Sequence, residues 1–499
     1  MPNLWKKTVA ALLLFALAAS TFASCAGDQT PTSTPTETTG SDIAVTTAAE
    51  TTPEKILYDA GIPAGTDYGG EDFNLHIFDS SVHITWVDVD FSATEETGDT
   101  LNDAVYIRMR NVNEKLNINI NPIPSKPEGA DMKKSVQSGD DAYDAGFVMT
   151  HDASSLAQSG LLVDLHTIDE LQLDQPWWDQ NAVEDLSVLN KLFMVTGDIG
   201  TMYKKSIGVI LFNKQLVAND PTLPNPYELV DNMTWTIEAF TEMGKKVSED
   251  VNGDSKWDKE DKYGLLFYCD LVPLGFIGAG IQLATKNEED VPEITFYSDK
   301  TVKVYEKYAE LLFDETLSFS WTEHNVGGND GVIAMFQDNR GLFNYNEFHA
   351  IENMRQMDTD FGILPIPLYE EGQDSYHHVI NPHVAAMLVV PKSGLDMTRI
   401  AHVLDALGAE SKNILTPAYY ETYLKGKGTR DDESEAVLDI VFSTLRYDAG
   451  YMNDWGTIGT FILPLVNNHN LNLTSQYEKI ENKVIKALEK AISNYEKNT

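Results

Sequence analysis

Hydrophobic and polar positions alternate in short segments along the chain, and runs with helical spacing separate these segments. Residues 73–78 alternate and predict a strand, residues 102–116 carry apolar side chains at helical spacing, and residues 117–121 alternate again. Residues 145–149 form an apolar run that predicts a buried strand, and a polar turn and a short helix ending at Gly160 follow it. Because strands and helices take turns along the chain, we expect a mainly parallel sheet.

The same pattern continues downstream and predicts a second group of strands and helices. We interpret residues 197–206 as a first crossing between two lobes, because a glycine-containing segment joins two apolar runs there, and residues 376–383 as a second crossing. The additional predicted strands are 191–195, 207–212, 340–346, 361–367 and 385–391, and the additional predicted helices are 235–247, 301–313 and 332–337, with helical sequence prevailing from 399 to the end. The pattern therefore predicts an α/β protein.

Composition and motifs limit the classes of partner and activity. A chain of 499 residues is too long for one hydrophobic core and indicates two or three domains. It carries 77 acidic against 36 basic residues, a formal charge of −41, which argues against binding to nucleic acid or to anionic lipid surfaces. No Gly-x-Ser-x-Gly, His-Glu-x-x-His, phosphate-loop or Gly-x-Gly-x-x-Gly motif is present. His377, His378 and His383 could form a metal site, but we interpret them as a polar surface or hinge cluster.

The N-terminal residues have the features of an export signal. Two lysines in residues 1–24 precede an apolar stretch that is too short to span a bilayer. The sequence Phe-Ala-Ser-Cys that ends at Cys25 resembles the lipobox of bacterial lipoproteins, in which the signal is removed before the cysteine and the thiol is acylated. An ordinary secretory signal with an incidental cysteine is the alternative. Residues 25–65 begin with a run rich in Thr, Pro and Ser, and we expect a disordered tether there.

The chain has two cysteines, Cys25 and Cys269. Acylation of Cys25 would leave one thiol and no possible intramolecular disulfide. Cys269 lies in the apolar run 265–269, so we expect a buried and unreactive thiol.

Residues 250–261 match the spacing of an EF-hand calcium loop. Oxygen-bearing side chains fall at positions 1, 3, 5, 9 and 12, and position 7 of such a loop binds through its backbone carbonyl. Ser255 replaces the usual glycine at the sixth position, and an aspartate replaces the final glutamate. The candidate ligands are Asp250, Asn252, Asp254, Lys256, Asp258 and Asp261. We expect one structural calcium ion, and an Asx-rich surface turn is the alternative.

One segment resembles a known family at the level of a motif. Residues 150–162 read Thr-His-Asp-Ala-Ser-Ser-Leu-Ala-Gln-Ser-Gly-Leu-Leu. This is similar to the segment after the third strand in the extracellular solute-binding lipoproteins of bacterial ABC importers, in the family of the maltodextrin binders. The resemblance implies that Asp152 hydrogen-bonds sugar hydroxyls, although it could instead only cap the following helix. Met149 stands where the maltodextrin binders have an aromatic residue.

The same resemblance implies further ligand-facing side chains. Trp178 could instead pack in the hydrophobic core, as tryptophans often do. For the other aromatic residues, ligand contact and core packing are equally possible. The candidate ligand-binding residues are Asp152, Trp178, Tyr203, Tyr345, Asn346 and Trp455. Aromatic rings pack on the C–H faces of sugars, and Asp and Asn bind their hydroxyls.

The resemblance implies a type II periplasmic-binding-protein fold, with two α/β lobes and a ligand between them. Lobe 1 would comprise residues 66–205 plus 366–415, and lobe 2 residues 206–365 plus 416–499. We expect a monomer without enzymatic activity, lipid-anchored on the outer face of the cell membrane, that captures a small solute, a sugar or oligosaccharide, by hinge closure and delivers it to an ABC permease. The alternatives are a secreted carbohydrate-active enzyme and a receptor that feeds a sensor system.

Overall fold

The structure is a computed structural model that describes residues 57–79, 90–126, 128–354, 357–425 and 431–497. The predicted signal, the lipidation site Cys25 and most of the predicted tether lie outside these residues. From Ile56 onward the chain folds as one unit. Residues assigned above to the tether belong to this unit, because the backbone of Tyr58 exchanges two hydrogen bonds with the Asn413 side chain and Ala60 is fully buried. The prediction of a tether up to residue 65 is therefore wrong for this stretch.

The first sheet contains four strands in the order β12-β3-β1-β2. Its strands are β1 (Glu71–Phe78), β2 (Ile118–Ser125), β3 (Ala145–Met149) and β12 (Ala386–Val389). β1 pairs in parallel with β2 and β3, whereas β12 runs antiparallel to β3, with Ala386 opposite Met149. The predicted strands and their mainly parallel pairing are confirmed.

The second sheet contains five strands in the order β10-β4-β9-β5-β8. Its strands are β4 (Gly208–Asn213), β5 (Tyr263–Phe267), β8 (Ser318–Ser320), β9 (Gly341–Glu347) and β10 (Phe361–Leu364). β5 runs parallel to β8 and β9, while β4 runs antiparallel to both β9 and β10. The carboxyl ends of β5, β8 and β9 therefore lie at the same edge of this sheet.

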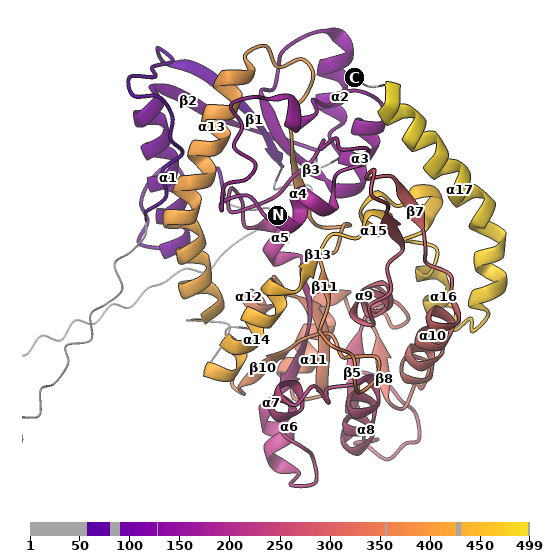
Figure 1. Cartoon of the computed structure of the whole chain (residues 1–499). Coiled ribbons are helices and arrows are strands. Elements are labelled where there is room, and N and C mark those ends of the chain that lie inside the picture. The colour runs from indigo at the N-terminus through magenta and orange to yellow at the C-terminus, as the bar shows by residue number, and fades with distance from the viewer. Residues whose placement is uncertain (1–56, 80–89, 127, 355–356, 426–430, 498–499) are drawn as a thin grey trace, which may run out of the picture. The chain divides into compact units, whose positions relative to one another are not determined.

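Helices cover the sheets, as Figure 1 shows. α1 (Thr100–Leu116) begins where the Asp99 carboxylate accepts two backbone N–H groups, and it packs against α13 (Met397–Glu410). α17 (Leu473–Lys497) contacts α3 (Thr150–Gln158) and α10 (Asp299–Leu312). The other helices are α2 (Ala130–Ser138), α4 (Gln180–Asp185), α5 (Met202–Lys205), α6 (Lys214–Asn219), α7 (Pro226–Asp231), α8 (Ile237–Val247), α9 (Leu271–Gly278), α11 (Asn329–Gln337), α12 (Ala350–Met354), α14 (Asp432–Ser443), α15 (Ala449–Asn453) and α16 (Leu463–Asn467).

Short elements complete the fold. These are the strand pairs β6 (Ala284–Lys286) with β7 (Pro292–Ile294) and β11 (His378–Val379) with β13 (Leu445–Arg446), the 3-10 helices η1 (Leu165–Thr167) and η4 (Trp455–Thr457), and the π-helical turns η2 (Ser411–Leu415) and η3 (Ala418–Lys425). In the described residues, no helix is both long and apolar enough to span a membrane.

The strand predicted at residues 191–195 is not formed. Only Val195 pairs with β12, by two hydrogen bonds to Leu388, and the chain then turns away. Gly197 lies against the backbone of Trp177 and Trp178, where a Cβ atom would overlap with it. This close approach fixes the path of the chain toward α5, so residues 191–195 follow the sheet edge for one residue only.

Two segments that connect the sheets lie side by side. The chain passes from the first sheet to the second through residues 202–207, and it returns through residues 378–385. Ile207 pairs with Ile380, and the backbone N–H of Asn381 donates to Ser206 O at 2.8 Å. The two segments interpreted above as crossings are therefore in direct contact.

Candidate functional site

A cavity of about 310 Å³ lies at the carboxyl-end edge of the second sheet. In open α/β sheets, ligands bind at this edge. We call it the strand-end cavity; it is lined by Tyr268, Asp270, Trp321, Gly327, Asn329, Asp330, Glu347, His349, Asn381 and Val384. The first three of these follow β5 and β8, Glu347 ends β9, and Asn381 lies on the returning connection between the sheets. The sheet order β9-β5-β8 brings these distant parts of the sequence together.

Asn381 holds two carboxylates at the wall of the strand-end cavity. Its Nδ2 donates to Asp270 Oδ2 at 2.8 Å and to Glu347 Oε1 at 2.9 Å, so both amide hydrogens bind carboxylates. Its Oδ1 accepts the backbone N–H of His383 at 3.0 Å. Because its own backbone N–H binds Ser206, Asn381 links the carboxylates to both connections between the sheets.

Glu347 is 1% exposed, and only one of its two oxygens accepts hydrogen bonds from the described residues. Its Oε1 also accepts the Tyr268 hydroxyl, whereas Oε2 has no hydrogen-bond partner among the described residues. Burial raises the pKa of Glu347 to about 7, although the bonds from Tyr268 and Asn381 oppose this shift. His349 Nδ1 lies 3.9 Å from Oε2, but burial and the charge of Lys205 lower the pKa of His349 to about 3, so the imidazole is neutral.

Two donors beside these carboxylates are also buried without a hydrogen-bond partner in the described residues. They are Trp321 Nε1 in the lining and the hydroxyl of Tyr451, whose pKa is raised by burial and by the charges of Asp270 and Glu347. A buried polar group without a partner costs about 1–3 kcal/mol. Such groups are rare in folded proteins, so their concentration around one cavity indicates a site for a polar ligand.

The predicted residues Tyr345 and Asn346 lie directly behind the strand-end cavity. The ring of Tyr345 packs on that of Tyr268, with centroids 4.9 Å apart. Asn346 points to the other face of β9 and exchanges two amide hydrogen bonds with Asn329, at 2.9 and 3.2 Å. Both side chains are buried and neither lines the cavity, so the structure gives them supporting positions behind Tyr268 and Asn329.

Asp152 does not line the strand-end cavity. It lies in the first turn of α3, where burial and the charge of Glu128 raise its pKa to about 6. Its neighbour His151 faces the connection instead: Nε2 lies 3.1 Å from Tyr451 O, and the ring meets that of His383 edge-on at 4.9 Å. The end of β3 therefore contacts the returning connection and α15, with His151 at the contact.

Trp178, Tyr203 and Trp455 are placed in the protein interior, away from the strand-end cavity. The indole N–H groups of Trp177 and Trp178 donate to the same atom, Asp405 Oδ1, at 2.9 and 3.0 Å. Tyr203 borders two smaller cavities in the region of the first sheet. Trp455 is 2% exposed in η4, which contacts α17.

Sequence reasoning missed the residues that line the cavity. Asp270 comes directly after the apolar run 265–269, and Glu347 directly after the predicted strand 340–346. Polar residues that follow buried strands were the available signal. Trp321 could not be found in this way, because β8 is only three residues long and was not predicted.

The buried thiol was predicted correctly. Cys269 is 8% exposed, and burial together with Asp270 raises its pKa to about 12. Its sulfur lies 3.7 Å from Asp270 Oδ1 at the rim of the strand-end cavity.

The side chains of the calcium-like loop point at backbone groups in this structure. Asp250 accepts the N–H groups of Gly253 and Ser255, and the fully buried Asp261 accepts those of Val251 and Asp258. The described residues contain no group of three or more His, Cys, Asp or Glu side chains placed to hold a metal ion. In this conformation the loop residues thus do not fit a calcium ion, and calcium binding stays a prediction that requires the carboxylates to turn inward.

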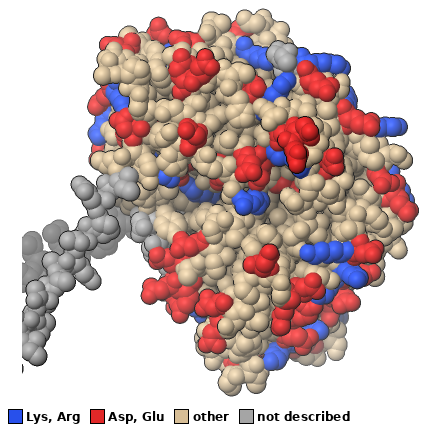
Figure 2. Space-filling model, viewed as in Figure 1, with Lys and Arg blue, Asp and Glu red and all other residues tan. Residues whose placement is uncertain are grey.

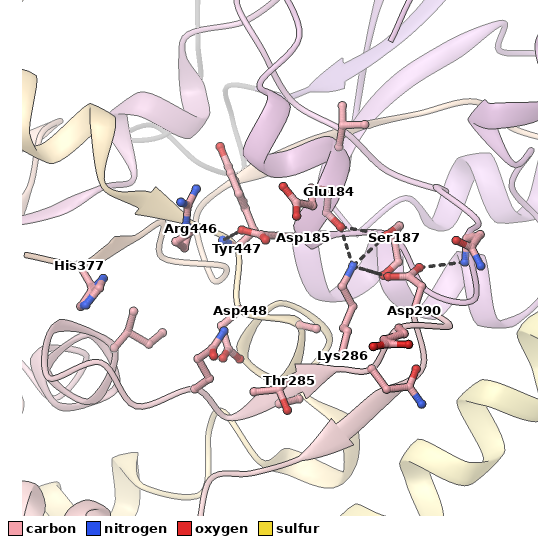
Figure 3. A pocket seen from close by; sticks show the side chains of 18 of the residues that line it. Glu184, Asp185, Ser187, Thr285, Lys286, Asp290, His377, Arg446, Tyr447 and Asp448 are labelled. Atoms are coloured by element: carbon pink, nitrogen blue, oxygen red, sulfur yellow. Dashed lines mark hydrogen bonds and ion pairs between the residues drawn. The ribbon is translucent and has the colours of Figure 1, made fainter. Parts of the chain in front are cut away.

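A second cavity, of about 840 Å³, lies between α4 and the β6–β7 hairpin (Figure 3). Its polar groups bind one another: Lys286 Nζ donates to Glu184 O and to Ser187 O and Oγ, and it pairs with Asp290 at 2.6 Å. The Asp185 carboxylate accepts the backbone N–H of Tyr447. None of the buried unpartnered side-chain atoms found in the described residues lines this cavity, which distinguishes it from the strand-end cavity.

Acidic residues outnumber basic ones on the face seen in Figure 2, in accord with the net charge.

No protein-family model matches the chain, and no curated protein matches its sequence. Solved structures do match. An ABC substrate-binding protein from Listeria monocytogenes in complex with cycloalternan has 15% identity and a TM-score of 0.51, covering 86% of this chain and 98% of that one. The fold is that of the type II periplasmic binding proteins.

Two further structures support this assignment. A cyclo/maltodextrin-binding protein complexed with maltotetraose has 14% identity and a TM-score of 0.51, covering 85% of this chain and 96% of that one. UgpB from Mycobacterium tuberculosis in complex with glycerophosphocholine has 12% identity and a TM-score of 0.53, covering 85% and 99%. The predicted fold class is therefore confirmed. Since the matched proteins bind solutes of different chemistry, the fold leaves the class of solute open.

Proposed function

We propose that this chain is the solute-binding component of an ABC importer, anchored outside the cell through Cys25, and that it captures a small polar solute, a sugar or oligosaccharide, in the strand-end cavity. The observation that carries the proposal is the cavity itself. It combines buried, unpartnered polar groups with a position at strand ends in a fold shared with solute-binding proteins. Polar ligands are recognised in concave sites by a few convergent polar groups.

The position of Asn381 supports the proposal of hinge closure. This residue contacts both carboxylates of the cavity and the other connection between the sheets. A solute that bridges the carboxylates and residues on the side of the first sheet would stabilise a closed arrangement, which the permease would then recognise. The proposal includes no catalytic step, as expected for a binding protein.

The experiment is a thermal-shift screen of mono- and oligosaccharides with peptides as controls, followed by calorimetry on the hits. Glu347→Gln should weaken binding of a hit about tenfold, because the carboxamide cannot accept at both oxygens. The matched control is Glu310→Gln, an exposed position on α10. Small-angle scattering should show compaction on binding. Binding of peptides alone would overturn the sugar assignment, and turnover of a bound glycan would favour a carbohydrate-active enzyme.

A further inference from the structure

The strand-end cavity is lined by acidic residues without a basic counterpart. Asp270, Asp330 and Glu347 line it, and its described lining contains no Lys or Arg. Lys205 is close enough to His349 for its charge to lower the pKa of that imidazole, but its side chain does not line the cavity. The cavity therefore presents negative charge that its own lining does not neutralise.

Two of these carboxylates are held close together, that of Glu347 buried and that of Asp270 half-buried. Asp270 and Glu347 share the two amide hydrogens of Asn381, and the charge of Asp270 raises the pKa of Glu347. An amide supplies a dipole and no charge, so the mutual repulsion remains. A like charge beside the buried Glu347 carboxylate favours a counter-charge or a proton there.

The groups around the carboxylates suit an organic cation. Glu347 lines the cavity, and its buried Oε2 has no hydrogen-bond partner in the described residues, so this oxygen can accept an N–H bond. The rings of Tyr268 and Trp321 also line the cavity, with centroids 5.9 Å apart and planes inclined at 45°. Aromatic faces attract ammonium groups, most strongly where water is excluded. A metal ion is disfavoured, because these residues do not form a group of three metal-ligating side chains.

We propose that the solute of the strand-end cavity carries a positively charged amine, which Asp270 and Glu347 bind beside the rings of Tyr268 and Trp321. This inference rests on the proposed function as a solute-binding protein and adds the charge of the solute to it. An amino sugar is both a sugar and a cation. Its hydroxyls would bind the neighbouring polar groups, and its ammonium would supply the positive charge that the cavity lining lacks.

Binding of the amine has a consequence for protons. Near neutral pH Glu347 exchanges its proton, because its pKa lies at about 7. The incoming ammonium stabilises the carboxylate, so part of the bound proton leaves to solvent when the complex forms. Binding of a neutral sugar should release no proton from Glu347.

The test uses calorimetry with ligands that share one skeleton and differ in one substituent. The probes are glucosamine, glucose and N-acetylglucosamine, the corresponding β-1,4-linked oligomers, and spermidine as an amine without a sugar. We expect the amine-bearing probes to bind about tenfold or more tightly than their hydroxyl or N-acetyl counterparts, as a charge-assisted bond in a buried site allows. Heats measured in buffers of different ionisation enthalpy should reveal proton release.

Two variants keep the inference falsifiable. Glu347→Gln should abolish the preference for amines and the proton release, Asp270→Asn should weaken the preference for amines, and Glu310→Gln should retain both; circular dichroism verifies folding of each. Equal or tighter binding of the neutral sugars overturns the inference and leaves the proposed function intact. Binding of spermidine without any amino sugar supports the cationic site and removes the sugar assignment. Failure of every amine-bearing probe to bind overturns the inference.

Discussion

Replacing Asp405 with asparagine tests how the interior beside α13 is held together. Asp405 is 1% exposed; its Oδ1 accepts the indole N–H groups of Trp177 and Trp178, and its Oδ2 accepts the Gln172 backbone N–H at 3.0 Å. An asparagine oxygen can still accept from both indoles, but its NH₂ group then faces the Gln172 N–H. Because a hydrogen bond to a charged acceptor contributes about 1.5–3 kcal/mol, we expect a loss of about 2 kcal/mol in the free energy of unfolding.

Asp405→Ala removes the acceptor of both indole N–H groups and of the Gln172 backbone N–H and should cost about 4 kcal/mol. Urea unfolding followed by tryptophan fluorescence and by circular dichroism measures both losses, with Asp169→Asn at an exposed position as the matched control. A loss below about 0.5 kcal/mol for Asp405→Asn, the level of ordinary surface substitutions, would refute the argument. Solute affinity should not change, since Trp178 lies away from the strand-end cavity; a folded variant with altered affinity would show that Trp178 contributes to binding.

Three further predictions concern other parts of the molecule. Lys286→Met removes the ammonium that binds the backbone carbonyls of Glu184 and Ser187 and leaves Asp290 without its ion-pair partner. The free energy of unfolding should therefore fall by about 1–3 kcal/mol. An unchanged denaturant midpoint in chemical unfolding would contradict this. Burial raises the pKa of Glu347 from 4.5 to about 7, so its contribution to stability is present below pH 4.5 and is lost as the pH rises through 7, by about 3 kcal/mol; this part of the pH profile should be missing in Glu347→Gln. Calcium should raise the melting temperature through residues 250–261 and a chelator should reverse it; no shift and no heat in calorimetry would remove the calcium site.

The sequence was sufficient for most strands, because each is apolar or alternates over several residues. β1, β3, β4 and β9 were predicted within one or two residues of their observed bounds. Residues 191–195 show a similar apolar pattern, yet they do not form a strand. That outcome depends on the packing of Gly197 against the backbone of the two tryptophans, which no local pattern records.

The candidate site was less predictable for a physical reason. Asp270 and Glu347 are two of 77 acidic residues, and only the order of strands in the second sheet brings them to one amide. The resemblance to sugar-binding proteins directed attention to aromatic residues such as Trp178, which the fold uses in its interior. It also indicated Tyr345 and Asn346, which precede Glu347 by two residues and one residue on the same strand. The location at a strand end was thus predictable, and the chemistry of the lining was not.

The buried thiol of Cys269 has a practical consequence for measuring solute capture. With a pKa of about 12, it holds almost no thiolate at neutral pH and will react very slowly with maleimide dyes. A cysteine placed on the surface near the connections between the sheets, in a chain that begins after residue 25, would therefore be labelled selectively. Such a chain could carry one environment-sensitive fluorophore without removal of the native cysteine, and its emission would report directly on opening and closing in solution.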